Sequence, residues 1–498
     1  MMDTARKKSS YRQIFAALTA NLVTFAYGVY TGWPATVQPL LQSSNTPLDV
    51  VLSDESISWS CSLGYMSAIL GTLIWGVLAD KFGRKITGYL TMAPFLVGWI
   101  IIMTSKSEYL LLLARFLGGL GGSGAAINSP MFVGEISDES MNAILGSLFI
   151  LMYNAGVLYV YVFGTFMNYV YLNIACLAVS VAFMVIWYYI PESPTCLVRK
   201  NNISEARESL KWFRGTTNDK EVETELESLS MRSDQVCTAS IGDYLETSTI
   251  KALIIGFIFQ TGTQLCGINV ILMYAVDIFN QSGSTLSPEM CTMLVGFVQV
   301  LGSVVACFVV TKADRKFFLI STYIIAAVSL YIIGGCFYAK FLDNTVNTGI
   351  LPVLCLSMHV IAFSIGLGMV PYIIYTEIFS PNVRNVCMSG LMFWNNVLGF
   401  GVIKAYPYLL NSLHISGCFW LFAMACTIIV PITYFFIPET KDKTYDQIHN
   451  QLQLWFPGLN DKAKSVTSLS VNSTKVVVVE SSDKKVYMEN NQQCCSEP

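Results

Sequence analysis

The stretch LADKFGRK, residues 78–85, decides the fold, because its pattern returns once, much later in the chain, as TKADRKFF, residues 311–318. Each copy holds an aspartate followed by basic residues, and each stands between two long apolar runs. Two further marks recur in the same order: GEISDESMN (134–142) and TEIFSPNVR (376–384), then PESPT (191–195) and PETKD (438–442). Marks that appear once in each half of a chain indicate a duplicated unit. The sequence therefore predicts two related halves.

The apolar runs around these marks predict a membrane protein. The chain has 498 residues, of which 53% are hydrophobic and only 13% are charged, whereas a soluble globular domain carries about 25% charged residues. Apolar runs of about 20 residues are long enough to cross a bilayer as helices, which favours membrane spans over the core helices of a large soluble protein. We predict twelve spans, six in each half, near residues 12–33, 57–79, 86–104, 108–130, 143–165, 169–190, 251–274, 289–311, 317–339, 351–376, 386–410 and 415–437.

The basic residues of the short loops predict the orientation of these spans. The loops assigned to the outside hold only Lys106 and Lys340, and residues 34–56 hold neither Lys nor Arg. We therefore expect a multi-pass protein of the plasma membrane with both termini in the cytosol, and an internal membrane remains an alternative. The start of the chain lacks the pattern of a cleavable signal peptide. The basic residues assigned to the cytosolic side are Arg6, Lys7, Lys8, Arg12, Lys81, Arg84, Lys85, Lys312, Arg315, Lys316 and Arg384.

Composition divides the chain into four parts. Residues 1–190 and 251–437 are expected to form one six-helix bundle each. Residues 191–250 between them are polar, and SEARESLKWFR and KEVETELESLS predict short cytosolic helices, with Ser204 as an N-cap. Residues 438–498 form a cytosolic tail that is rich in Ser, Asn and Lys towards its end, has no helical period there, and is expected to be disordered.

In combination, the motifs resemble the sugar porter family of the major facilitator superfamily over about residues 12–445. GVLADKFGRK is similar to the loop signature of the superfamily, and ARFLGGLGG, PESP, TQLCGIN followed by Tyr274, PYIIYTEIF and PETK are similar to sugar porter marks. Within the family, YNAGVL, APFLVGW, FSIGLG and Lys404 are similar to facilitated trehalose transporters. The resemblance implies an all-α membrane protein with the major facilitator fold, in which two pseudo-symmetric six-helix bundles hold the substrate between them.

A polar run inside one span, QTGTQLCGINVILMY (260–274), is then expected to bind a sugar. Carboxamides donate and accept hydrogen bonds at once, and an aromatic ring covers the apolar face of a sugar. Gln260 and Gln264 share a helix face with Thr263, and Gly267 is expected to break the helix before Asn269. The alternative is that these amides only join helices. The expected sugar-binding residues are Gln260, Thr263, Gln264 and Asn269 of this run, together with Gln299, Tyr372 and Asn395, which the family resemblance implies.

Other positions differ from the glucose carriers of the family. Ile150 and Thr263 stand where those carriers have glutamine, Ser364 stands where they have glutamate, and Asn396 replaces a tryptophan. These changes put glucose itself in doubt, so the expected substrate is a hexose or the disaccharide trehalose. A sugar sensor that binds without transporting is a further alternative.

The mode of transport is predicted from the first span. The proton-coupled members of the family carry an aspartate there, and the matching residue in this sequence is Gly28. We therefore expect facilitated diffusion by alternating access, with proton symport as the alternative and His359 as its candidate group. The family resemblance also implies a cytosolic gate, in which charges at the cytosolic helix ends form salt bridges that close the cytosolic side of the protein. These gate residues are Asp80, Arg84, Glu135, Glu192, Arg315, Glu377, Arg384 and Glu439.

Two positions depart from the family pattern of this gate. Asn142 stands where an arginine is expected seven residues after Glu135, and Asp314 stands where the second loop mark has glycine.

Two basic residues also lie inside spans. Arg115 is expected to be paired or to face a polar cavity, and Lys404 is expected to reach towards the membrane surface.

The sequence lacks the marks of several other functions. It has no nucleophile elbow, no P-loop and no metal-ligand spacing, so we expect no enzyme, no cofactor and no metal site. A net charge of −3 gives no reason to expect a nucleic-acid partner. The expected partners are a small sugar and the lipid bilayer, with the protein as a monomer. Of three N-x-S/T sites, Asn202, Asn280 and Asn472, the topology leaves only Asn280 outside as a glycosylation candidate.

Overall fold

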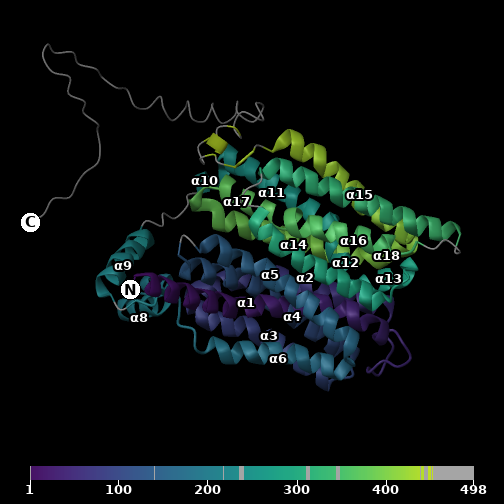
Figure 1. The fold of residues 1–498 in the computed structure, drawn as a ribbon, viewed down its shortest axis with the longest axis horizontal. Helices are drawn as coiled ribbons and strands as arrows, with labels where there is room; N and C mark the ends of the chain where they lie inside the picture. Colours follow the sequence, from purple (N-terminus) through teal and green to yellow (C-terminus); the bar gives the residue numbers. More distant parts are fainter. Residues whose placement is uncertain are drawn as a thin grey trace, which may run out of the picture.

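A computed structural model describes most of the chain, and every regular element within this part is helical. The long helices lie side by side (Figure 1). The expected tail beyond residue 451 and the loop residue Lys312 lie outside the described residues. The described residues are 2–138, 141–216, 218–234, 241–309, 314–343, 348–437, 439–441, 443, 447–449 and 451.

The first half of the chain forms six long helices at the positions of the first six predicted spans. Two of them, α1 and α5, approach so closely that only glycine fits between them. A Cβ atom at Gly28 would lie 2.0 Å from the carbonyl oxygen of Tyr153, and one at Gly156 would lie 2.1 Å from that of Phe25. The six helices are α1 (Met2–Leu41), α2 (Asp54–Phe82), α3 (Arg84–Thr104), α4 (Glu108–Ile136), α5 (Asn142–Phe166) and α6 (Tyr169–Trp187).

Short helices connect the halves, as the polar composition of this segment predicts. They are α7 (Pro194–Arg199), α8 (Ile203–Arg214), α9 (Asp219–Asp234) and α10 (Ile241–Leu245). The prediction of Ser204 as an N-cap is wrong, because α8 begins two residues earlier than that cap requires, at Ile203, and Asn202 caps it. The carboxamide oxygen of Asn202 accepts from the backbone N–H of Glu205 at 3.4 Å, and Ser204 donates its own hydroxyl to that oxygen at 3.2 Å.

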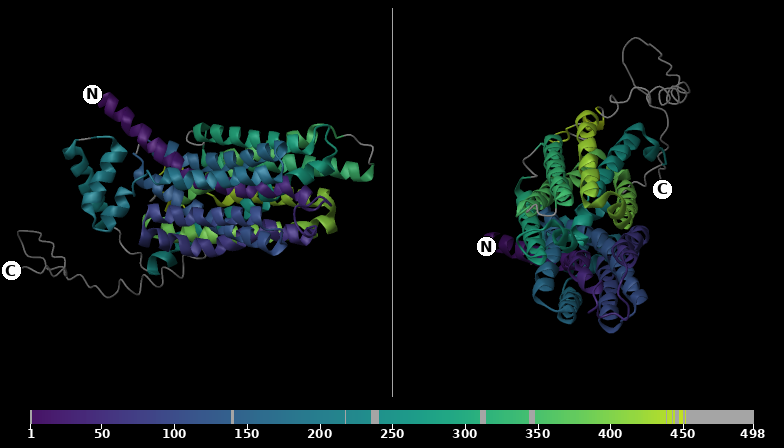
Figure 2. Two further views of the ribbon diagram at one scale, coloured as in Figure 1. Left: turned by 90° about the horizontal axis from the view of Figure 1, so that it is seen from below. Right: turned by 90° about the vertical axis from the view of Figure 1, so that its right-hand side faces the viewer.

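The second half contains nine helical elements, several of them interrupted. They are α11 (Thr247–Leu265), α12 (Ile268–Met273), α13 (Ala275–Ser282), α14 (Pro288–Val309), α15 (Arg315–Leu342), α16 (Leu351–Ala362), the π-helical η1 (Phe363–Leu367), α17 (Val370–Ile378) and α18 (Pro381–Phe436). The first and second halves of the chain occupy separate sides of the molecule, coloured purple to blue and green to yellow (Figure 2).

The described residues contain eleven helices that are long and apolar enough to cross a membrane, where the sequence predicts twelve spans. The difference lies in α18, which has 56 residues and contains both of the last two predicted spans. Its backbone leaves helical geometry at His414, with φ 56° and ψ 171°. No extended loop separates the two spans, so the predicted boundary corresponds to this single break.

The outer surface of the long helices is apolar, which suits a bilayer rather than water. Leu73 and Val77 of α2 expose 64% and 67% of their surface, and Val185 of α6 exposes 57%. The carboxamides Gln260, Gln264 and Gln299 are instead buried in the interior of the helix assembly.

Candidate functional site

The polar run of residues 260–274 lies at a helix break, as its glycine predicts. Helix α11 ends at Leu265, and Gly267 takes up a left-handed conformation with φ 78° before α12 begins at Ile268. A side chain at Gly267 would be strained by this backbone and would place its Cβ 2.5 Å from the ring of Phe422. The break turns Asn269 back towards the end of α11, which an unbroken helix would not do.

Three of the predicted amides meet at this break. Gln264 Nε2 donates to Asn395 Oδ1 of α18 at 2.8 Å, and Asn269 Nδ2 donates to Gln264 Oε1 at 2.8 Å. Gln264 is almost fully buried, while Asn269 and Asn395 are partly accessible. The three side chains, which we call the amide triad, keep further donor and acceptor positions for a ligand.

A fourth predicted residue, Gln299 of α14, joins the two halves of the chain. Its Nε2 donates to Asn154 Oδ1 of α5 at 2.8 Å, and Asn154 Nδ2 donates in turn to Ser303 Oγ of α14 at 2.5 Å. All three side chains are buried. The remaining acceptor of Gln299, Oε1, is buried without a partner among the described residues. A buried group of this kind is costly unless a ligand satisfies it.

The other predicted site residues have mixed environments. Gln260 is buried, and its Nε2 has no partner in the described part of the chain. Thr263 does not join the amides, since its hydroxyl donates to Phe259 O of its own helix at 2.8 Å. Tyr372 of α17 is half-buried and packs edge to face on Tyr375, with ring centroids 5.8 Å apart. Its hydroxyl is within 3.9 Å of the Met392 sulfur, a weak contact.

Residues outside the predicted sugar-binding set also belong to this region. Asn154 is the first of these, and its signal was the short YNAGVL motif in an otherwise apolar span. Tyr27 of α1 packs on Tyr153 of α5, with ring centroids 5.3 Å apart. Tyr27 is also close enough to Tyr372 of α17 to interact with it electrostatically. Ser364 lies in the π-helical turn η1 and faces Gly302 of α14. Turns of this kind are frequent at functional sites.

The predicted gate residues of the first half form one cluster around Arg84. The Arg84 guanidinium binds Glu135 at 2.8 Å and Asp80 at 3.1 Å, and its exposed fraction is 1%. Glu192, the middle residue of the PES motif, accepts from the backbone N–H groups of Arg84 and Lys85 at 2.9 and 3.1 Å. These N–H groups open α3, where the helix dipole favours a carboxylate.

The second half repeats this arrangement around Arg315. Arg315 pairs with Glu377 at 3.5 Å, and Glu439 accepts from the backbone N–H groups of Arg315 and Lys316 at 3.0 Å each. Arg384 donates to Phe379 O at 3.2 Å, and its Nε has no partner in the described residues. The gate residues therefore form two clusters. The pairs of Arg84 with Glu135 and Asp80, and the pair of Arg315 with Glu377, each join residues of the same half.

At the opposite end of the helices the two halves touch. The Lys404 ammonium of α18 lies 4.0 Å above the ring of Trp59 of α2, and Ser58 donates to Lys404 O at 3.2 Å. A cation is stabilised over an indole face, and the expected reach of Lys404 towards the membrane surface stays a prediction. We call this the far end and the end with the gate clusters the near end.

Arg115 and His359 are both fully buried in the interior. Arg115 Nη1 donates to Tyr30 O at 2.7 Å and its Nε to Ser60 O at 3.0 Å, while the Tyr30 ring stacks 3.7 Å from the guanidinium carbon. Within the described residues Arg115 has no carboxylate partner within ion-pair distance. The expected pairing is thus made with backbone carbonyls and an aromatic ring, which together link α4 to α1 and α2.

Comparison with known proteins gives the family of the chain. Residues 14–452 match the family described as "Sugar (and other) transporter". Because the match covers most of the chain, the protein belongs to the sugar transporter family. The members are transporters rather than enzymes, so both the resemblance and the expectation of a non-enzyme are confirmed.

Several relatives are named facilitated trehalose transporters. The one from Drosophila virilis is 30% identical over 449 residues, which are 89% of this chain and 49% of that protein. The one from Aedes aegypti is 28% identical over 449 residues, 89% of this chain and 55% of that protein. The chain thus spans about half the length of the relatives that it matches.

Solved structures share the fold. The inward-open form of the xylose transporter XylE from E. coli has a TM-score of 0.73 at 18% identity, and covers 89% of this chain and 99% of that chain. A structure named D-xylose-proton symporter has a TM-score of 0.67 at 20% identity, with coverages of 87% and 98%. The fold is therefore the same in a proton symporter, and coupling has to be argued from individual residues.

Proposed function

We propose that this protein is a facilitative sugar transporter that works by alternating access, with a hexose or trehalose as its substrate. The observation that carries the proposal is the amide triad of Gln264, Asn269 and Asn395 at a broken helix. Irregular backbone at membrane depth is tolerated where it lines a cavity. Amides with spare donors and acceptors suit the hydroxyl groups of a sugar, which also donate and accept. The trehalose transporters among the relatives support this substrate class.

The proposed mechanism uses the contact between the halves. The triad belongs to the second half, and the Gln299–Asn154 bond ties that half to α5 of the first. A sugar that takes over such bonds would interact with both halves at once, so its binding would change the free energy of their relative movement. In this scheme Tyr372 covers the apolar face of the sugar ring. We further propose cytosolic termini, a plasma membrane location and a monomeric protein, as the sequence predicts.

Uptake measurements test the proposed activity. Labelled trehalose, glucose, fructose and a polyol would be offered to cells that lack their own sugar carriers and express this protein. Uptake of at least one sugar, saturable and above that of cells with an empty vector, is expected. A sensor that binds without transporting would give sugar-induced thermal stabilisation of the purified protein without any uptake, which would overturn the proposed function.

The proposal of uniport rests on the first helix. Between Arg12 and Leu41, α1 has no acidic residue. Gly28 packs against the backbone of α5, so a carboxylate at that position would collide with the helix instead of facing a cavity. The α1 residue that faces the buried Arg115 is Tyr30, which is uncharged at neutral pH. A symporter needs a titratable group that responds to the transported sugar, and α1 offers none.

Uptake is accordingly expected to be independent of a proton gradient. A protonophore should leave the initial rate unchanged, and adding sugar should produce no inward current in voltage-clamped oocytes. The measurement is sugar uptake with and without the protonophore, with a known proton-coupled sugar carrier as the positive control. Accumulation above the external concentration that the protonophore abolishes would contradict uniport, and a His359→Gln variant would then test the remaining candidate.

The position of the contacts supports a conformational proposal. The halves meet at the far end through Lys404 and Trp59, while the near-end ion pairs stay within each half. We take this to be the state that is open at the near end, which the orientation predicted from the basic loops makes the cytosolic side. In the opposite state, the free Nε of Arg384 and the unpaired Oε2 of Glu377 would find partners across the halves.

Asn142 offers a direct test of this gate. It is the exposed first residue of α5, close in sequence to Glu135. Asn142→Arg should supply a missing cation and stabilise the state that is closed at the near end. A partly exposed pair contributes at most about 1 kcal/mol, so the ratio of the two states should shift by up to about fivefold. Distance labels across the near end measure this ratio. Asn142→Gln is the neutral control, and an unchanged or oppositely shifted distribution in Asn142→Arg would argue against a lock at this position.

A further inference from the structure

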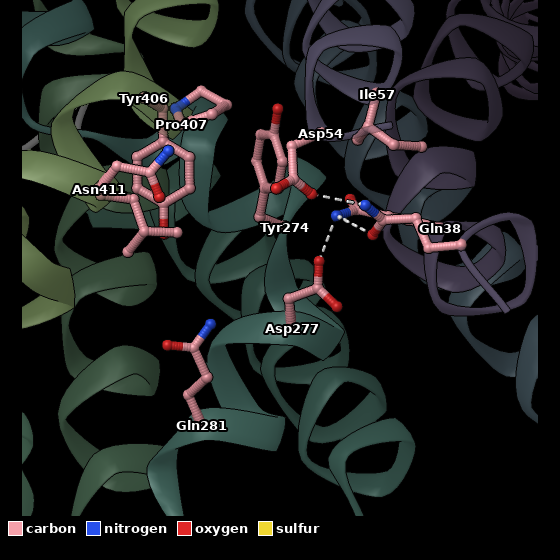
Figure 3. A pocket seen from close by; sticks show the side chains of 11 residues that line it. Gln38, Asp54, Ile57, Tyr274, Asp277, Gln281, Tyr406, Pro407 and Asn411 are labelled. Carbon is pink, nitrogen blue, oxygen red and sulfur yellow. Dashed lines mark hydrogen bonds between the residues drawn. The ribbon is translucent and has the colours of Figure 1, made fainter. Parts of the chain in front are cut away.

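A cavity of about 300 Å³ lies at the far end of the helices, away from both gate clusters (Figure 3). Asp54, which lines it, begins α2, and Asp80 of the first gate cluster lies near the end of the same helix. The rise of an α-helix places these two residues about 40 Å apart. The cavity walls include no residue of the amide triad.

The walls of this far-end cavity come from both halves of the chain. Gln38 of α1 donates through Nε2 to the carboxylate of Asp277 of α13, which is the hydrogen bond that crosses the cavity. The same Nε2 lies 3.3 Å from Gln42 Oε1, and Gln42 Nε2 donates to Asp54 Oδ1 at 2.7 Å. Tyr406 and Asn411 of α18 complete the side opposite α1 and α2.

The cavity is rich in hydrogen-bond acceptors, and its wall also holds the Tyr274 hydroxyl, which is buried without a partner among the described residues. Gln38 is 6% exposed, and its Oε1 is buried without a hydrogen-bond partner among the described residues. Asp54 and Asp277 add carboxylate oxygens, and no lysine or arginine lines the cavity. A buried acceptor without a donor costs free energy. The arrangement therefore favours a ligand that brings several donors, as the hydroxyl groups of a sugar do.

The rest of the wall is aromatic and apolar. The rings of Tyr274 and Tyr406 lie against each other with centroids 4.9 Å apart, and each exposes only 4% of its surface. Ile57 and Pro407 lie beside them. A bare cation would use the oxygens but gain nothing from this wall, and an apolar ligand would leave the carboxylates without partners. A sugar ring uses both, because it has a hydroxyl rim and an apolar face.

We propose that the far-end cavity is a second sugar-binding site, sized for one sugar ring and separate from the amide triad. The inference rests on the proposed sugar transport and adds a second site to it. Its volume is at the lower limit of small-molecule sites, which suits a single ring rather than a larger glycan. Since both halves form its walls, a sugar bound here stabilises the state in which the far end is closed.

The acidity of the cavity gives the site a pH dependence. Burial raises the pKa of the Asp277 carboxyl to about 6, although its hydrogen bond with Gln38 acts in the opposite direction. The titratable groups that face it are Asp54 from α2, Tyr274 beside it and Tyr406 from α18. Asp277 is a strong acceptor at both oxygens when ionised, whereas protonation makes it a weaker acceptor and turns one oxygen into a donor. Sugar affinity at this site should therefore be highest above pH 6 and fall as the pH drops below that value.

Equilibrium binding to the full-length protein in lipid nanodiscs tests the second site. Labelled glucose and labelled trehalose are the probes. Wild-type protein should bind in two components, and Gln264→Ala should weaken the component of the triad while the far-end component persists. When Asp277→Asn is added to Gln264→Ala, the affinity of the remaining component should fall about tenfold or more, because a charged acceptor is lost. Adding Asn411→Ala instead should lower that affinity by a smaller factor, because only a neutral amide is lost. Asn280→Ala is the matched control, since Asn280 is exposed on α13 and does not line the cavity.

The outcomes separate the second site from the proposed function. If Gln264→Ala removes all binding, or if Asp277→Asn and Asn411→Ala leave the residual component unchanged, the second site is wrong while sugar uptake still supports the transporter. If sodium or calcium ions bind with a dependence on Asp277 and displace the sugar, the cavity is a cation site and the proposal fails. If wild-type protein neither binds nor takes up any sugar, the proposed function itself fails. Thermal melting of each variant verifies that it is folded.

Discussion

Replacing Gln264 with alanine is expected to reduce sugar uptake by about tenfold to a hundredfold at equal surface expression. The substitution removes the side chain that both Asn269 and Asn395 contact at 2.8 Å. Both of these amides then lose a partner at a partly buried position, and each unpaired polar group costs about 1–3 kcal/mol. The sugar loses its own contact with Gln264 as well. Asn269→Ala should act in the same direction with a smaller effect, because Asn269 makes only one of the two bonds.

The measurement is the initial rate of uptake over a range of sugar concentrations, together with surface biotinylation. Thr261→Ala is the matched control, since Thr261 lies on the same helix but contacts Trp394, at 3.1 Å, on another face. Normal kinetics in both Gln264→Ala and Asn269→Ala would mean that the triad only joins helices and that the sugar binds elsewhere. A loss of surface protein in place of a kinetic defect would point to the same conclusion.

Replacing Arg115 with leucine is expected to destabilise the protein by about 3 kcal/mol or more. The guanidinium is fully buried and satisfies two backbone carbonyls, those of Tyr30 and Ser60, which belong to different helices. Hydrogen bonds to a charged group contribute about 1.5–3 kcal/mol each, and the carbonyls left behind have no water to replace it. Stacking on the Tyr30 ring is also lost. Leucine fills part of the space but offers no donor.

The apparent melting temperature of the purified protein in detergent measures this effect. Arg115→Lys keeps the charge but has no planar fork, so it should recover only part of the stability. Arg199→Ala is the exposed control, because Arg199 has a side chain 48% exposed and a pair with Asp80 at 3.8 Å, which contributes little. A stable Arg115→Leu protein that no longer transports would show that Arg115 acts in transport rather than in folding.

Much of the fold could be predicted because membrane solvation leaves few choices. Backbone groups in lipid must be paired internally, so each apolar run of about 20 residues has to form a helix. The first six predicted spans correspond to α1–α6, and the repeated marks predict the equivalent positions of Arg84 and Arg315. The connection between the last two spans could not be predicted, because nothing in the sequence distinguishes a loop from the single break at His414.

The site could be predicted only in part. Gln264 and Asn269 are predicted because carboxamides are rare in apolar spans, and Asn395 is predicted from the family resemblance. The structure brings these three together. Thr263 was placed with them by helix periodicity, but its hydroxyl is used by the backbone of its own helix. Asn154 was missed as a partner of Gln299, because the two residues lie 145 positions apart and no local pattern connects them.

The sequence by itself determined the family, the helical architecture and the residue types of the amide triad, since these depend on local composition, motif spacing and the need to pair the backbone in lipid. Only the tertiary structure decided which charges pair with which, that Gly28 is a close helix contact, and that Gln38 and Asp277 meet across a far-end cavity. The physical reason is that such contacts depend on how helices distant in sequence pack against one another. That packing depends on the whole assembly, and the sequence of a single helix does not show which other helices it contacts.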